Sequence, residues 1–187
     1  MDALLRWIAA TSLLAIGTVI AISLAGALLF AFRRRRSEWR DALNRTGSET
    51  LLVASVALIV IATLLTPQLP GAGQRTILLE PFWDLREALA GRQVLARAIA
   101  EMIGNVLLFI PLGVAIVLRW PALGLTAATG AAAAISLVVE IGQALLADGR
   151  MSDVTDVLMN GIGALIGAVA VRRALSPQEP LTPGTMH

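Results

Sequence analysis

Long apolar stretches separated by short polar ones set the limits on what this chain can fold into. A helix needs about 20 predominantly apolar residues, and at least roughly 17, to cross the hydrocarbon core of a bilayer. Five stretches are long enough, at about residues 4–32, 50–66, 98–118, 123–147 and 153–171. The chain is also 57% hydrophobic, whereas a soluble domain is roughly 45–50% apolar. We therefore predict an all-α polytopic membrane helical bundle with about five transmembrane helices.

The arginines give the expected orientation of these helices. All 15 basic residues are Arg, and the predicted layout places nine of them on one side of the membrane and six on the other. The densest cluster, Arg33 to Arg36, follows the first stretch, and such clusters stay in the cytoplasm. All four Trp fall at or just beyond the ends of spans, where aromatic belts sit. We expect the N-terminus outside and the C-terminus in the cytoplasm.

A shorter helix is expected between the second and third spans. From Phe82 to about Ala96, the residues Phe82, Leu85 and Leu89 share one helical face, and charged residues lie elsewhere on the circumference. This pattern predicts an amphipathic helix on the outer membrane surface. The chain then divides into a first helix with an arginine-rich cytoplasmic loop (1–49), a second helix with an outer loop (50–77), a core of the amphipathic segment and three spans (78–171), and a disordered cytoplasmic tail (172–187).

The composition excludes several kinds of chemistry. The chain has no Cys, and its only His is His187, the last residue. Thiolate nucleophiles, Cys-ligated metals, His general bases and His-ligated zinc are therefore excluded. Any catalysis would use carboxylates, Arg, amides and hydroxyls, and the one cofactor left open is a hard divalent cation such as Mg²⁺. A net charge of only +2 gives no reason to expect a nucleic-acid partner.

Three of the spans carry polar groups on one helical face. In the fourth span, three side chains are spaced i, i+4 and i+7 and fall within about 60° of one another: Ser136, Glu140 and Gln143. The fifth span has a similar stripe, formed by Asp153, Asp156 and Asn160. The third span carries Glu101 and Asn105. Ionisable groups within a membrane are costly and usually mark a functional site.

All of these residues lie in the outer halves of their helices, so we expect them to converge on one pocket that opens to the extracytoplasmic leaflet. Arg150, in the turn before the fifth span, can bridge two carboxylates. The predicted ligand-binding residues are Asn105, Ser136, Glu140, Gln143, Arg150, Asp153, Asp156 and Asn160. The catalytic role is unassigned, and the candidates for it, and for a metal site, are Glu140, Asp153 and Asp156.

Structural roles compete with this interpretation. Asn105, Ser136 and Gln143 suit interhelical hydrogen bonds. Asp153 suits the N-cap of the fifth helix. A packing seam of small residues would explain Gly163-xxx-Gly167. Glu140 is the hardest to explain structurally, because it is far from a helix end.

Three motifs resemble those of VanZ-like membrane proteins. They are Asn105-Val-Leu-Leu-Phe-Ile-Pro111-Leu-Gly113, Ser136-x3-Glu140-x2-Gln143, and Arg150-x2-Asp153-x2-Asp156-x3-Asn160-x2-Gly163-x3-Gly167. The likeness covers about residues 78–171, and Leu79-Glu80-Pro81-Phe82 is similar to a Pro-Phe segment that precedes these motifs in the family. The resemblance implies a protein of the bacterial envelope, in the cytoplasmic (inner) membrane. Its founding member accompanies glycopeptide resistance and lowers susceptibility to teicoplanin-type, lipid-tailed antibiotics.

Three functions remain open from the sequence. The first is an accessory envelope factor whose outer-leaflet pocket binds a lipid or lipid-linked headgroup, with Arg150 meeting a phosphate or carboxylate. The second is an enzyme acting on a lipid-linked phosphate or sugar, with Mg²⁺ held by carboxylate and amide oxygens or with Glu140 as general acid–base. The third is a transporter, which we rank last because the acids are confined to one leaflet. The sequence leaves open whether the protein is an enzyme and what its oligomeric state is.

Overall fold

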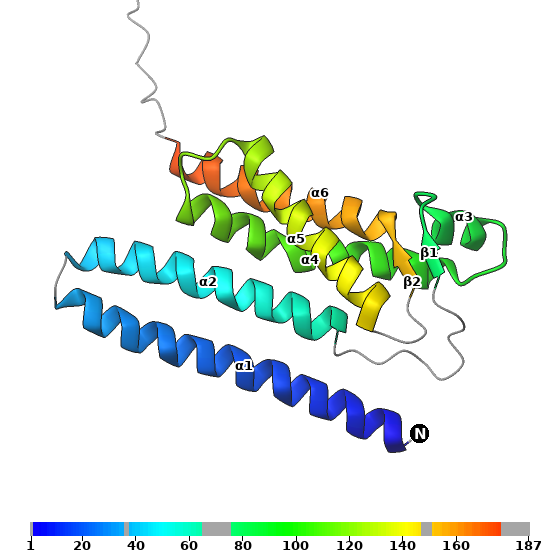
Figure 1. The fold of residues 1–187 in the computed structure, drawn as a ribbon, viewed down its shortest axis with the longest axis horizontal. Coiled ribbons are helices and arrows are strands. Elements are labelled where there is room, and N and C mark those ends of the chain that lie inside the picture. The colour runs from blue at the N-terminus through cyan, green and yellow to red at the C-terminus, as the bar shows by residue number, and fades with distance from the viewer. Residues whose placement is uncertain (1, 36–37, 65–75, 147–150, 177–187) are drawn as a thin grey trace, which may run out of the picture.

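The computed structural model describes residues 2–35, 38–64, 76–146 and 151–176. Within these ranges the chain forms six helices and two short strands (Figure 1). The elements in order are α1 (Asp2–Arg34), α2 (Trp39–Leu64), β1 (Thr76–Leu78), α3 (Trp83–Leu89), α4 (Leu95–Arg119), α5 (Leu125–Leu146), β2 (Met151–Asp153) and α6 (Val154–Leu175). Five of the helices are long and apolar enough to cross a membrane. The predicted all-α membrane bundle is confirmed, and the chain is a multi-pass membrane protein.

The long helices run alternately in opposite directions, so the bundle has two distinct ends (Figure 1). The strand end, as we call it, holds β1, β2, α3, the start of α4 and the start of α6. The arginine end is the opposite one, where α1 meets α2, where α4 meets α5, and where α6 ends. Its arginines with described side chains are Arg33, Arg34, Arg35, Arg40, Arg45, Arg119, Arg172 and Arg173.

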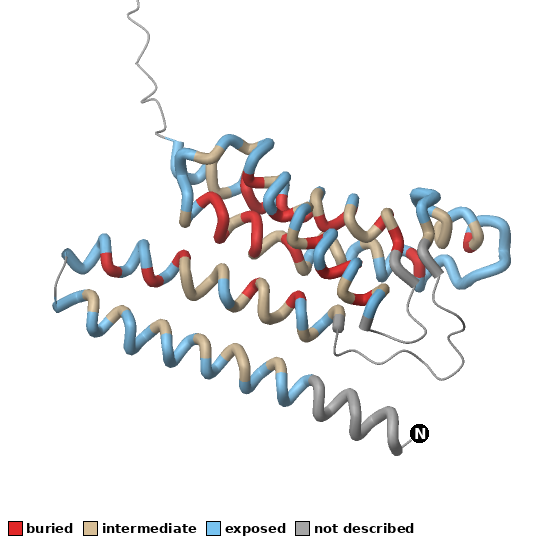
Figure 2. Tube along the Cα trace, viewed as in Figure 1, coloured by how far each residue is buried: buried red, intermediate tan, exposed pale blue. Residues whose placement is uncertain are grey.

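The core lies where α4, α5 and α6 meet, with α2 packed against it. Figure 2 shows the buried residues concentrated in these helices, whereas the described side chains of α1 are half-buried or exposed. Phe109 and Leu112 of α4, Ala132 of α5, Ala164 of α6 and Ile59 of α2 are completely buried. The exposed Leu, Ile and Val side chains of the long helices face outward, as expected for helices that contact lipid.

A seam of glycines lets α4 and α6 approach closely. A Cβ atom on Gly113 would overlap the carbonyl oxygen of Ala164, and one on Gly163 would overlap that of Val106. A Cβ on Gly167 would overlap the backbone of α4 one turn further along. Backbones can pack this closely only where side chains are absent. The packing seam predicted for Gly163 and Gly167 is confirmed, and Gly113 provides its counterpart on α4.

Helix α2 begins well before the apolar pattern placed the second span. The sequence predicted a polar segment over 37–49 and a helix from about Thr50, but α2 is helical from Trp39. Ala42, Thr46 and Ser48 are each at most 3% exposed, so these first turns are packed. Hydropathy indicates which residues can sit in hydrocarbon, and it does not indicate where a helix that extends past the hydrocarbon begins.

The segment between the second and third spans also differs from its prediction. One amphipathic helix over Phe82–Ala96 was expected, but α3 ends at Leu89 and a turn through Gly91, with φ of 75°, leads into α4. Leu89 is 69% exposed, whereas Leu85 faces α4. Strands β1 and β2, too short to be predicted, pair in parallel with Leu78 opposite Asp153. The disordered tail was predicted to begin at residue 172, but α6 continues to Leu175. The predicted outer loop at 68–73, Arg150 and the tail from 177 lie outside the described residues.

Candidate functional site

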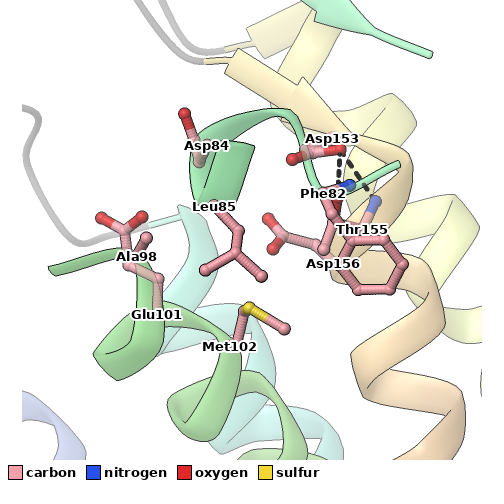
Figure 3. Close-up of a pocket in the computed structure, with 9 residues that line it drawn as sticks. All are labelled: Phe82, Asp84, Leu85, Ala98, Glu101, Met102, Asp153, Thr155 and Asp156. Carbon is pink, nitrogen blue, oxygen red and sulfur yellow. Dashed lines mark hydrogen bonds between the residues drawn. The ribbon is translucent and has the colours of Figure 1, made fainter. Parts of the chain in front are cut away.

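A small pocket opens at the strand end, between α3, α4 and α6 (Figure 3). Its volume of about 20 Å³ is room for about one water molecule, which needs roughly 10–15 Å³ on this measure. A single chemical group of that size fits inside, and the remainder of a larger ligand would lie outside the pocket. The lining residues are Phe82, Asp84, Leu85, Ala98, Glu101, Met102, Asp153, Thr155 and Asp156.

Asp153 ends β2 and caps α6. Its backbone is extended, and its Oδ1 accepts hydrogen bonds of 2.8 Å from the backbone N–H and from the hydroxyl of Thr155. Such a cap satisfies a donor that the first turn of a helix leaves unpaired, and stabilises by roughly 0.5–2 kcal/mol. The N-cap role considered for Asp153 from the sequence is therefore confirmed. The carboxyl is only 8% exposed and also lines the pocket.

Thr155 connects α6 to the turn that precedes α3. The backbone N–H of Phe82 donates to Thr155 Oγ1 at 2.8 Å, across 73 positions of sequence. Phe82 has φ of 60° and ψ of 27°, a left-handed conformation that is uncommon for a bulky residue. This conformation costs on the order of 1–3 kcal/mol and persists only where the surroundings enforce it. The pairing of β1 with β2 and the bond to Thr155 hold the turn in place.

Asn105 and Asp156 join α4 to α6 at the inner side of the pocket. Asn105 Nδ2 donates to Asp156 Oδ1 at 2.5 Å. Glu101 lies one turn before Asn105 on α4, lines the same pocket, and accepts a 2.8 Å hydrogen bond from Arg97 Nε. Carboxylates from two different helices therefore face one small space, which Figure 3 shows with the side chains of Leu85 and Met102 beside them.

Ser136 and Asn160 form a second polar pair deeper in the bundle. Asn160 Nδ2 donates to Ser136 Oγ at 2.7 Å, and the two residues are 4% and 0% exposed. Glu140 follows Ser136 by one turn on α5 and is 7% exposed. Buried polar pairs of this kind hold transmembrane helices together, so Ser136 and Asn160 stabilise the contact of α5 with α6.

Gln143 points toward a different helix. Its Nε2 donates to the backbone carbonyl of Thr63 on α2 at 3.0 Å. It therefore stabilises the packing of α5 against α2 and does not line the pocket.

The charges at the strand end are mostly negative. Four carboxyl groups line the pocket, on Asp84, Glu101, Asp153 and Asp156. Two nearby arginines pair with acids outside it: Arg86 with Glu80, and Arg92 with Glu87 at 2.6 Å. A third, Arg97, lies outside the lining and pairs with Glu101 at 2.8 Å, so the other three lining carboxyl groups carry most of the negative charge. The hydrogen bonds from Arg92 lower the pKa of the Glu87 carboxyl. Among the described side chains that line the pocket, none is basic, so it attracts a positively charged or hydrogen-bond-donating group.

A comparison with protein families identifies the chain. The model of the family described as VanZ/LLP1 matches residues 51–175, from within α2 to the end of α6. The chain belongs to the VanZ/LLP1 family. No curated protein and no solved structure matches it.

The motifs that carried the family resemblance form contacts between the helices that build the pocket. In the first motif, Asn105 bonds to Asp156 and Gly113 packs on Ala164. In the third motif, Asp153 caps α6. Each of these contacts involves α6. The motif residues therefore fix the position of α6 against α4, and with it two of the three sides of the pocket.

The structure separates the predicted site residues of this VanZ/LLP1 protein into groups. Asp153 and Asp156 line the pocket, with Asn105 bonded to Asp156. Ser136, Asn160 and Glu140 lie deeper, Gln143 contacts α2, and Arg150 lies outside the described residues. Among the described residues, no three His, Cys, Asp or Glu side chains are grouped so that they could hold a metal ion. Glu140, Asp153 and Asp156 thus do not form such a group.

Six lining residues were not predicted as part of a site: Phe82, Asp84, Leu85, Ala98, Met102 and Thr155. Asp84 and Phe82 were assigned to an amphipathic helix, and their position over α6 depends on the pairing of β1 with β2. For Thr155 the sequence offered one local indication: it follows the N-cap Asp153 by two positions, where the backbone N–H bonds to the cap. Its bond to Phe82 involves a part of the chain too distant for any local pattern to indicate.

Proposed function

We propose that this VanZ/LLP1 protein is an accessory factor of the bacterial envelope that binds the headgroup of a lipid or lipid-linked precursor. The pocket at the strand end carries this proposal, because it combines apolar side chains with carboxyl groups beside the first turns of α4 and α6, two of the apolar candidate spans. A lipid headgroup likewise lies between an apolar environment, formed by the acyl chains, and a polar one. The founding member of the family lowers susceptibility to lipid-tailed glycopeptide antibiotics, and we propose that this protein does the same through occupation of the pocket.

The lining favours the cationic part of such a headgroup. An ammonium group is close to water in size, and its three N–H donors require oxygen acceptors. The pocket has room for about one water, and carboxyl groups of Asp84, Glu101, Asp153 and Asp156 line it. We therefore propose an amine-bearing headgroup, with the ammonium in the pocket and the phosphate and acyl chains outside.

The distribution of charge supports an extracytoplasmic position for the pocket. Among described side chains the arginine end has eight arginines, and the strand end has three, Arg86, Arg92 and Arg97. Arginine-rich ends remain in the cytoplasm. In this orientation the strand end faces outward, in the leaflet that carries envelope precursors.

Conservative pocket variants test this function. Asp156→Asn keeps an oxygen that can accept from Asn105, and Glu101→Gln removes a second charge from the lining. Both should reduce the amount of phosphatidylethanolamine that purified protein retains in native mass spectrometry, by about tenfold for a lost charge-assisted contact of roughly 1.5 kcal/mol. In a host that depends on this protein, both should raise susceptibility to teicoplanin.

The matched control is Glu87→Gln, which also removes an acid at the strand end but outside the pocket. It should leave lipid retention and susceptibility unchanged. The proposal fails if Asp156→Asn and Glu101→Gln are produced at normal levels and bind phosphatidylethanolamine as the unaltered protein does.

A further inference from the structure

The arginine end carries a concentrated positive charge that the proposed function does not use. Eight arginines and three acids, Glu38, Asp41 and Glu49, have described side chains there, a formal excess of five positive charges. Retention in the cytoplasm requires only that arginines be present near the ends of spans. Their arrangement is a further property of the arginine end, and it involves side chains of α1, α2 and α4.

Glu49 on α2 pairs with arginines of two other helices. Its Oε2 lies 2.7 Å from Nη1 of Arg33 on α1, and its Oε1 lies 3.6 Å from Nε of Arg119 on α4. Arg45 precedes Glu49 by one turn on α2, so both side chains lie on the same face of that helix. We call Arg33, Arg45, Glu49 and Arg119 the arginine cluster. One carboxylate among three guanidinium groups leaves this cluster positively charged.

The arginine cluster remains open to its surroundings. The side chains of Arg33, Glu49 and Arg119 are 32%, 29% and 38% exposed, and Arg45 is an exposed residue. α1 and α2 continue past Glu49 to their connection, so the cluster lies beside a projecting helical hairpin and not at its tip (Figure 1). Its guanidinium groups can therefore be reached from the membrane interface along the side of the hairpin.

Trp120 marks the level of the lipid headgroups beside the arginine cluster. It directly follows Arg119 at the end of α4 and is 43% exposed, whereas Trp39, 55% exposed, begins α2 at the far end of the hairpin. The guanidinium of Arg40 lies 5.3 Å from the ring centroid of Trp39, and that of Arg119 lies 5.3 Å from the ring centroid of Trp120. Exposed Trp side chains sit at the headgroup level of a bilayer. Arg119 therefore belongs both to the cluster and to the aromatic belt.

We propose that the arginine cluster binds an anionic phospholipid. The phosphate would accept hydrogen bonds from Arg119 and Arg45, since guanidinium groups bind phosphate oxygens in a bidentate manner. The acyl chains would lie along α2 and α4, and the ring of Trp120 would contact the glycerol region. Basic pockets between transmembrane helices are known to hold anionic headgroups in this way. Arg172 does not take part, because it donates to the backbone carbonyl of Leu123.

Lipid retention tests this site independently of the pocket at the strand end. The full-length protein would be reconstituted in nanodiscs of equal parts phosphatidylglycerol and phosphatidylcholine, released, and examined by native mass spectrometry. We expect bound phosphatidylglycerol to exceed phosphatidylcholine. Arg45→Gln and Arg119→Gln should each reduce the bound phosphatidylglycerol by roughly fivefold, because a basic residue near a membrane surface contributes about that factor.

Arg92→Gln is the control, since it removes an exposed arginine at the strand end. It should leave phosphatidylglycerol retention unchanged. Arg119→Gln also breaks an ion pair with Glu49, so a loss of lipid in that variant could come from altered folding. Arg45 is exposed, so a loss of lipid in Arg45→Gln reports on lipid binding alone. Equal retention of the two lipids by the unaltered protein, or an equal loss in Arg92→Gln, would overturn the proposal.

Discussion

Thr155 joins three segments of the chain through one hydroxyl group. Its Oγ1 accepts from the backbone N–H of Phe82 and donates to Asp153 Oδ1. The residue is 5% exposed, so water cannot easily replace either bond. The turn before α3, the end of β2 and the start of α6 therefore depend on the same side chain.

Replacing Thr155 by Val should loosen this junction without changing its shape. The Phe82 N–H then loses its acceptor, and an unsatisfied buried group costs roughly 1–3 kcal/mol. We expect a lower thermal unfolding temperature in detergent and faster hydrogen exchange over residues 78–89. Thr155→Ser keeps the hydroxyl and should show little of either effect. Equal protection of residues 78–89 in the Val and Ser variants would contradict this account.

The residues that sequence alone could place are those whose partners are local. The cap formed by Asp153 involves the residue two positions later, and its type and position predicted it. The bond from Gln143 to Thr63 and the bond from Phe82 to Thr155 connect distant segments, and residue type cannot select the partner. The stripe of Ser136, Glu140 and Gln143 was predicted to face one pocket, but Ser136 bonds to α6 and Gln143, two turns further along α5, bonds to α2.

At the scale of elements, the contact of α4 with α6 determines the geometry of the bundle. Gly113, Gly163 and Gly167 place the two backbones in direct contact. The polar pair of Asn105 and Asp156 continues the same contact toward the pocket. Helix periodicity and small residues predicted the existence and the packing role of α6, because both are properties of a single helix.

Glycine substitutions on α4 should separate close packing from helix propensity. Gly113→Ala places a methyl group against the carbonyl of Ala164, where only a backbone shift can relieve the overlap, and should destabilise by about 1–3 kcal/mol. Gly104→Ala, on the same helix with nothing within 4 Å, should be neutral or stabilise by about 0.4–1 kcal/mol. Reversible unfolding in mixed micelles measures both changes. The seam would not be a determinant of stability if Gly113→Ala behaved as Gly104→Ala does.

Across the whole molecule, the two ends carry opposite charge. The described side chains give the arginine end an excess of positive charge, whereas acids outnumber arginines by six to three at the strand end. Counting arginines along the sequence predicted this polarity. It could not predict that α1 and α2 project as a hairpin, because the polar residues over 38–49 resemble a loop in composition and are helical in the structure.

The absence of Cys from the chain allows a direct test of orientation. Ala90, at the strand end, and Ala122, between α4 and α5, are both exposed. In intact cells, a membrane-impermeant maleimide should label Ala90→Cys and should label Ala122→Cys only after the membrane is permeabilised, because we propose that the arginine end lies in the cytoplasm. The cysteine-free protein is the background control. Labelling of Ala122→Cys alone in intact cells would show the reverse orientation.

The pairing of β1 with β2 has a consequence for synthesis on the ribosome. Residues 76–78 emerge long before residues 151–153, with two entire spans between them. The backbone N–H of Phe82 therefore has no hydrogen bond to Thr155 until α6 has entered the bilayer. A nascent chain that is halted after α5 has the first four spans but no completed pocket, so the pocket forms only when translation of α6 is finished.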